Sequence, residues 1–290
     1  MDSYSIISNN RSILGESPVW DEKLQRIYWV DIEGKCLHAW SYIDNKKLIW
    51  NFDHRLCAIS LTNQNNTLLC AFDTFFSFYD LKNHIIKKLD KQVTLPSKVR
   101  FNDGKTDGYG RFWCGSMSES NPSKPGGAIY MLDRKQEIHE VIKGIHISNS
   151  ITASFDNKNF YYADTYKKLI YKTSLYKKKP YIKNANIFLD NNSLPGFPDG
   201  STVDSNNTLW NAEWNGGQVT QYDKNGKIIS KIKTPMKKPT CVAFGGPNMN
   251  KLFITSAKDI NTNEEDISGK IICIKMHVKG QLSNRFILDL

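Results

Sequence analysis

The stretch Phe160–Lys172 reads FYYADTYKKLIYK, two short runs of aromatic and aliphatic residues separated by a polar turn. Alternating runs on both sides of a turn are typical of an antiparallel β-hairpin. Five other stretches have the same form, and the first strands of the six predicted hairpins begin at Ile27, Leu68, Phe112, Phe160, Leu209 and Leu252. The steps between these positions are 41, 44, 48, 49 and 43 residues.

A repeat of about 45 residues is typical of a β-propeller, in which each unit forms one four-stranded blade. No long stretch holds the 3.6-residue apolar period of an amphipathic helix. The sequence therefore predicts an all-β fold, a six-bladed β-propeller. We expect residues 1–290 to form a single domain, with the N- and C-terminal strands sharing one blade and closing the ring.

The composition argues against two classes of partner. The chain has 39 Lys and Arg residues against 29 Asp and Glu residues, a net charge of +10, but its lysines are scattered and form no single basic stripe. This pattern predicts a solvated surface that attracts small anions, and no nucleic-acid partner. The N-terminus lacks a signal-peptide pattern, and no apolar run approaches the roughly 18 residues of a membrane span. We therefore expect a cytoplasmic protein with no membrane partner.

The cysteines and histidines give no metal or redox motif. The six cysteines are far apart and form no C-x-x-C pair, which predicts buried free thiols in a reducing compartment. They are Cys36, Cys57, Cys70, Cys114, Cys241 and Cys273. The six histidines show no H-x-H or H-E-x-x-H spacing, so a closed zinc site is not expected.

Polar side chains precede four of the predicted strands at nearly the same distance. Glu16, Arg100, Asn149 and Asp199 lie 11, 12, 11 and 10 residues before the strand that follows each of them. Equivalent positions in a ring of blades converge on one axis, so these side chains are expected to meet. Carboxylate and amide oxygens suit a hard divalent cation with open positions for water or substrate.

Each of these residues also has a structural interpretation. Asp199 lies in a Pro-Asp-Gly sequence and Asn102 in an Asn-Asp-Gly sequence, and both are common turn formers. Glu16 could be a solvated loop residue, and Arg100 could pair with a neighbouring acid. Only the equivalent register of the four units favours the functional interpretation.

Several of these motifs together resemble the SMP-30/gluconolactonase/luciferin-regenerating-enzyme family, which includes regucalcin and bacterial sugar lactonases. The similarity extends from about residue 13 to about residue 275 and is nearest to the bacterial lactonases. The matching stretches are LGESPVW (Leu14–Trp20), RFNDGKTDGYGRFWCGSM (Arg100–Met117), SNSITASFDNKNFYYADT (Ser148–Thr165), PDGSTVDSNNTLWNAEWNGGQV (Pro198–Val219) and CVAFGGPNMNKLFITSA (Cys241–Ala257).

The resemblance implies a six-bladed propeller with one divalent metal ion (Ca²⁺, Mg²⁺, Mn²⁺, Zn²⁺ or Fe²⁺) held by Glu16, Asn149 and Asp199. It implies that Arg100 and Asn102 contact the substrate. It also implies that Asp199 is the catalytic residue, which acts as general base or orients the attacking water.

The chain departs from the family pattern at two places. Ser150 follows Asn149 where the family usually has glycine. Ser118-Glu119-Ser120 replaces an acidic pair, so a substrate-contacting acid is absent at the second position, and Glu119 is the candidate to take its place.

These features predict metal-dependent hydrolysis of a sugar lactone to an aldonic acid by a monomer or weak homo-oligomer. The chain has no G-x-S-x-G motif, which disfavours a covalent serine mechanism. Two alternatives stay open. One is a non-catalytic, regucalcin-type propeller that binds a divalent metal or a ligand, and the other is a metal-dependent phosphotriesterase or other esterase.

Overall fold

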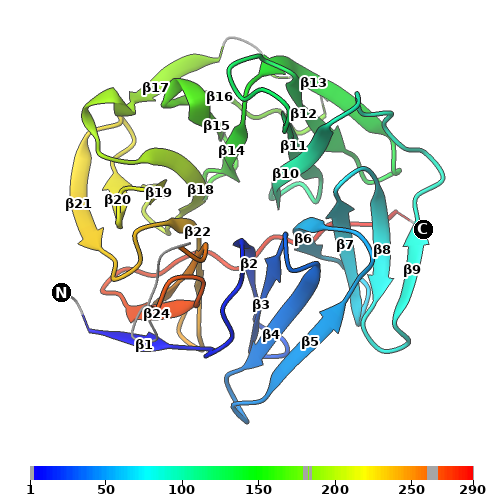
Figure 1. Cartoon of the computed structure of the whole chain (residues 1–290), viewed down its shortest axis with the longest axis horizontal. Coiled ribbons are helices and arrows are strands. Elements are labelled where there is room, and N and C mark those ends of the chain that lie inside the picture. Colours follow the sequence, from blue (N-terminus) through cyan, green and yellow to red (C-terminus); the bar gives the residue numbers. More distant parts are fainter. Residues whose placement is uncertain (1–2, 179–181, 183–184, 260–266, 290) are drawn as a thin grey trace.

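The structure is a computed structural model that describes residues 3–178, 182, 185–259 and 267–289. Its strands form six four-stranded sheets around a central axis, which confirms the predicted six-bladed β-propeller (Figure 1). The described part of the chain contains no α-helix, only the short 3₁₀ turns η1 (Thr165–Lys167) and η2 (Asn191–Ser193). None of its helical segments could cross a membrane.

The blades follow one another around the ring, and the strands nearest the axis are β2, β6, β10, β14, β18 and β22 (Figure 1). Blade 1 comprises β2 (Gly15–Asp21), β3 (Arg26–Asp31), β4 (Cys36–Ser41) and β5 (Lys47–Asn51). Blade 2 comprises β6 (Leu56–Leu61), β7 (Thr67–Phe72), β8 (Phe76–Asp80) and β9 (Ile85–Lys88). Blade 3 comprises β10 (Val99–Thr106), β11 (Phe112–Ser118), β12 (Gly127–Leu132) and β13 (Ile138–Ile145).

The second half of the ring repeats the arrangement. Blade 4 comprises β14 (Ser148–Ala153), β15 (Asn159–Asp164), β16 (Leu169–Ser174) and β17 (Asn186–Asp190). Blade 5 comprises β18 (Phe197–Val203), β19 (Leu209–Trp214), β20 (Gln218–Tyr222) and β21 (Ile228–Lys233). Blade 6 combines β22 (Pro239–Gly245), β23 (Lys251–Ser256) and β24 (Ile272–Lys275) with the N-terminal β1 (Tyr4–Ile6), which pairs with β24.

The aromatic residues that mark the repeat pack between blades. Trp113 of blade 3 lies 4.4 Å from Phe160 of blade 4, measured between ring centroids. Trp20 of blade 1 stacks on Phe253 of blade 6 at 5.7 Å. Because a single sheet cannot bury both of its faces alone, these contacts explain why large apolar residues recur once per blade.

After β24 the chain crosses the propeller and pairs with residues of two blades. Gly280 forms a β-bridge with Asp204 of blade 5, and Phe286, which is fully buried, forms one with Thr62 of blade 2. Residues of all six inner strands, together with Gln281–Asn284, line a cavity of about 40 Å³. This segment therefore closes one end of the axial channel.

All six cysteines are buried and unpaired, as the sequence predicted. The inner strands share a second feature, a β-bulge early in the strand. The register breaks between Glu16 and Val19, Leu56 and Ala58, Phe101 and Gly104, Asn149 and Thr152, Pro198 and Ser201, and Pro239 and Val242. A bulge bends the strand and changes the direction of the side chains beside it, so the six bulges shape the same level of the channel.

Candidate functional site

The strand register defines one ring of equivalent positions at the bulges. Each position of the ring directly follows a residue of the innermost strand that pairs with the second strand. For example, Asn149 follows Ser148, which pairs with Asp164, and Asp199 follows Pro198, which pairs with Glu213. The residues that follow these paired residues in the six blades are Glu16, Cys57, Asn102, Asn149, Asp199 and Thr240. Four of the six side chains are acids or amides, so oxygen donors dominate the ring.

The register alters one part of the prediction. Counting residues from the strands put Arg100 in this ring, whereas the strand pairing puts Asn102 there and Arg100 two residues earlier. The count was off because turn lengths differ between blades. Glu16 and Asn149 pair with the second strand of their blades and Asp199 directly follows the paired Pro198, so the three residues occupy equivalent positions of the register.

A chain of hydrogen bonds orients the side chain of Asn149. Its Oδ1 accepts from Nδ2 of Asn102 at 2.9 Å, and its Nδ2 donates to Oγ1 of Thr165 at 2.9 Å. The Thr165 hydroxyl then donates to the carbonyl of Pro198 at 2.8 Å. The amide therefore has one defined orientation, and Oδ1 has a second lone pair available for a cation. No sequence pattern pointed to Thr165, because one of its contacts joins two parts of blade 4 and the other crosses to blade 5.

Three carboxyl groups are buried together near the axis. Burial and the charge of Asp103 raise the pKa of Glu16 to about 8. Burial and the charges of Glu16 and Asp103 raise the pKa of Asp199 well above its ordinary value. Burial also raises the pKa of Asp103. Arg100 and Lys105 offset this repulsion only in part.

A group of buried carboxylates that repel one another fits a cation site. Glu16 and Asp199 are 9% and 5% exposed, and each supplies carboxylate oxygens at the level of the Asn149 amide. A divalent cation would compensate the charge that the protein leaves uncompensated, and all of these donors are oxygens. Cys57 and Thr240 at two other ring positions are poorer metal ligands. Burial raises the pKa of Cys57 to about 12, and Thr240 donates its hydroxyl hydrogen to the carbonyl of Gly15.

A network of charged side chains adjoins the ring. Arg100 donates through Nη1 to Oδ1 of Asn102 at 2.7 Å and through Nε to Oε1 of Glu119 at 3.3 Å. Arg55 holds the same carboxylate at two points, Nη1 to Oε1 at 2.6 Å and Nη2 to Oε2 at 2.9 Å. The hydrogen bonds from Arg55 lower the pKa of Glu119, whose side chain is 34% exposed. The structure thus brings Arg100, Asn102 and Glu119 together and adds Arg55, which the sequence analysis did not single out.

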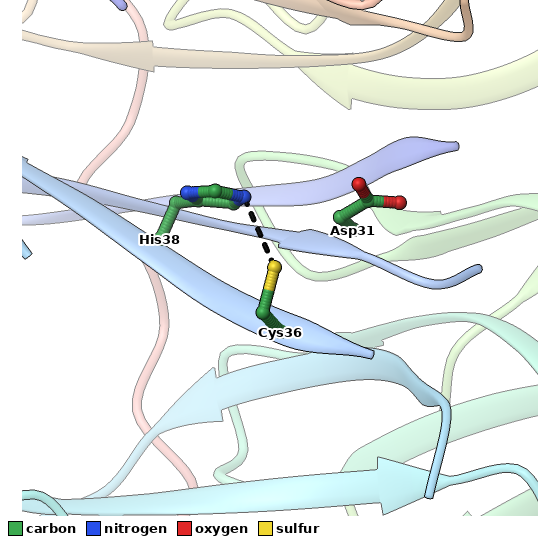
Figure 2. A group of neighbouring side chains, drawn as sticks. All are labelled: Asp31, Cys36 and His38. Atoms are coloured by element: carbon green, nitrogen blue, oxygen red, sulfur yellow. Dashed lines mark hydrogen bonds between the residues drawn. The ribbon is translucent and has the colours of Figure 1, made fainter. Parts of the chain in front are cut away.

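A second cluster of potential metal ligands lies in blade 1, where Asp31, Cys36 and His38 lie with their ligand atoms within 4.8 Å of one another (Figure 2). Cys36 Sγ is 3.2 Å from Nε2 of His38. The Asp31 carboxylate, however, already accepts three backbone N–H groups, from Ile13 at 2.8 Å, Gly34 at 2.9 Å and Leu14 at 3.0 Å.

The equivalent positions of blade 4 explain this cluster as structural. Asp164 takes the place of Asp31 and also accepts a backbone N–H. Tyr171 takes the place of His38 and stacks on Tyr162 at 5.0 Å, just as His38 stacks on Trp29 at 5.0 Å. The aspartate therefore caps a loop, and the histidine fills an aromatic position.

Residues 14–258 match the family model described as "SMP-30/Gluconolactonase/LRE-like region". Pentonolactonase XacC of Haloferax volcanii is 32% identical over 84% of this chain and 81% of its own length. L-arabinolactonase of Azospirillum brasilense is 30% identical over 97% of this chain and 95% of its own length.

The similarity extends to solved structures. The crystal structure of a calcium-binding protein, regucalcin, from Agrobacterium tumefaciens superposes with a TM-score of 0.91 at 25% sequence identity. The match covers 98% of this chain and 97% of that one.

Proposed function

The chain belongs to the SMP-30/gluconolactonase/LRE-like family, and from this premise we propose that it hydrolyses a sugar lactone to the aldonic acid with one bound divalent metal ion. The observation that carries the proposal is the convergence of Glu16, Asn149 and Asp199 at one level of the channel. Relatives named as lactonases that cover most of the chain support the reaction class. We propose that residues 1–290 form one catalytic domain; the cytoplasmic location and the monomeric or weakly homo-oligomeric state stay predictions.

The proposed roles follow from the groups present. Glu16, Asn149 and Asp199 would hold the metal ion, whose identity among Ca²⁺, Mg²⁺, Mn²⁺, Zn²⁺ and Fe²⁺ is open. Such an ion stabilises negative charge that develops on the lactone oxygen. Asp199, ionised when it holds the cation, accepts a proton from the attacking water.

The substrate would be held by the network beside the ring. Arg100 and Asn102 are proposed to bind the hydroxyl or ring oxygens of the sugar, and they also keep Asn149 in its orientation. Glu119 is proposed to accept hydrogen bonds from the sugar hydroxyls. Arg55 is itself surrounded by acids, since Glu33 lies at 3.4 Å and Asp73 at 3.7 Å, so it serves to hold Glu119 and not to bind an anionic substrate.

The first test is hydrolysis of a panel of pentono- and hexonolactones by the purified protein, measured as acid release in weak buffer. We expect turnover that a chelator abolishes and that one of the five cations restores. Absence of turnover above the spontaneous rate with each of the cations supplied would contradict the lactonase proposal. Cation binding without turnover would instead favour a binding protein of the kind named in the regucalcin structure.

The role of Glu119 predicts a change that depends on the substrate. Replacing Glu119 with Gln is expected to raise KM for the hydroxylated lactone about tenfold or more, because a hydrogen bond to a charged group is lost. Hydrolysis of γ-butyrolactone, which has no hydroxyl group, is expected to change less than twofold. Glu33→Gln is the matched control, because Glu33 contacts Arg55 but is not a proposed substrate ligand. An equal loss for both lactones would indicate a structural role for Glu119.

A further inference from the structure

Ser150 adopts a backbone conformation that serine rarely takes. Its φ is +54°, in the left-handed region, where a Cβ atom is crowded and glycine is favoured. The residue is fully buried in the bulge of β14, directly after Asn149. A glycine would meet the backbone requirement with less strain, so the presence of serine calls for a contact that its hydroxyl group makes.

That contact is with the backbone of Asp199 in the neighbouring blade. The Ser150 hydroxyl donates to the carbonyl oxygen of Asp199 at 2.6 Å. Asn211, also fully buried, donates through Nδ2 to the same carbonyl at 2.9 Å, to Oγ of Ser150 at 3.0 Å and to Oγ of Ser201 at 2.9 Å. Two side chains from two blades therefore converge on one carbonyl group.

This carbonyl group lies at the point that sets the direction of the Asp199 side chain. It belongs to the peptide between Asp199 and Gly200, inside the bulge of β18, where strand pairing does not fix the backbone. Cys241 of blade 6 approaches Gly200 so closely that an added Cβ would lie 2.2 Å from its Sγ, so a neighbouring blade packs against the peptide on that side. The hydrogen bonds from Ser150 and Asn211 hold it on the other.

We propose that Ser150 and Asn211 are positioning residues that fix the Asp199 carboxylate relative to Asn149 and thereby increase the affinity for the metal ion. Ser150 is suited to this task because it is adjacent to Asn149 in sequence and hydrogen-bonded to Asp199 across the blade boundary. The inference rests on the proposed function, since it takes Asn149 and Asp199 as metal ligands. It concerns the serine at which this chain departs from the glycine of the family pattern.

The test is the Ser150→Gly variant of the full chain, stripped of metal and titrated with Ca²⁺ and with Mn²⁺ in a calorimeter. We expect the affinity for the cation that wild type binds to fall about tenfold, the loss that one hydrogen bond accounts for. The unfolding midpoint of the chelated variant is expected to stay close to that of wild type, because relief of the strain at φ +54° offsets the lost hydrogen bond. If Ser150 had only a structural role, the variant would keep the wild-type affinity for the cation and would unfold at a lower midpoint.

Two further variants make the outcome unambiguous. Asn211→Ala is expected to weaken cation binding as well, and it tests the proposal even where Ser150→Gly does not fold. Gln136→Gly relieves a similar strain, φ +65°, in a turn of blade 3, and is expected to leave the affinity unchanged. If wild type binds a cation and both Ser150→Gly and Asn211→Ala bind it within twofold, the positioning role is wrong. If wild type binds neither cation, the titration is repeated with Mg²⁺, Zn²⁺ and Fe²⁺. Binding of none of the five would mean that the proposed metal site fails and that the positioning role fails with it.

Discussion

Replacing Asp199 with Asn is expected to lower kcat for the best lactone by about 10²–10⁴-fold, the usual contribution of a general base. Asparagine keeps the size of the side chain and one oxygen, but it cannot accept a proton from water at neutral pH. It also removes one of the negative charges that would hold the metal ion. The measurement is steady-state acid release at saturating metal, compared with Asp44→Asn, an exposed aspartate in the turn before β5.

The same variant is expected to be no less stable than wild type when metal is removed. Burial and the neighbouring charge of Glu16 disfavour the ionised form of Asp199, so a neutral side chain relieves a cost in the folded state. Activity and stability should therefore change in opposite directions. A variant that kept more than a tenth of the wild-type kcat would contradict the assigned role, and loss of activity through unfolding would show as a lower melting temperature.

The six blades could be predicted from the sequence because the hairpin pattern is local. Phe160 and Trp113 mark their strands whether or not their packing partners are known, and the repeat length follows from such marks. The equivalent position of Glu16, Asn149 and Asp199 along the channel could be predicted for the same reason, because each lies at a similar distance from the strand that follows it. The sequence could not show that Asn102, and not Arg100, occupies the ring position of blade 3. That position depends on the bulge of β10, which is defined by strand pairing and not by residue spacing.

The supporting residues were out of reach of the sequence for a different physical reason. Thr165, Arg55 and Asn211 act on residues of another strand or another blade, through hydrogen bonds that no local pattern encodes. Ser150 did carry a signal, since serine stands where the resembled family has glycine. That signal gained a meaning only when the structure showed both its left-handed backbone and its contact with Asp199.

The buried carboxylates predict how stability depends on pH when no metal is present. The pKa of Glu16 is about 8 in the folded protein, against an ordinary value near 4.5. Between these two values the folded state binds more protons than the unfolded state, so the free energy of unfolding falls as pH rises. The loss should be complete near pH 8, and its size is on the order of a few kcal/mol. Chelated protein should therefore melt at a higher temperature at pH 5 than at pH 8.

Adding the metal ion is expected to reverse this dependence. The cation binds the ionised carboxylates, so binding below pH 8 must release protons from Glu16 or Asp199, and saturating metal should stabilise the protein most near pH 8. Calorimetric titration in two buffers of different ionisation enthalpy measures the protons released. Glu16→Gln provides the matched variant, which should show a shallower fall in melting temperature from pH 5 to pH 8 and release fewer protons. Binding without proton release at pH 6 would contradict this expectation: either the carboxyl groups are already ionised at that pH, or the cation is held elsewhere.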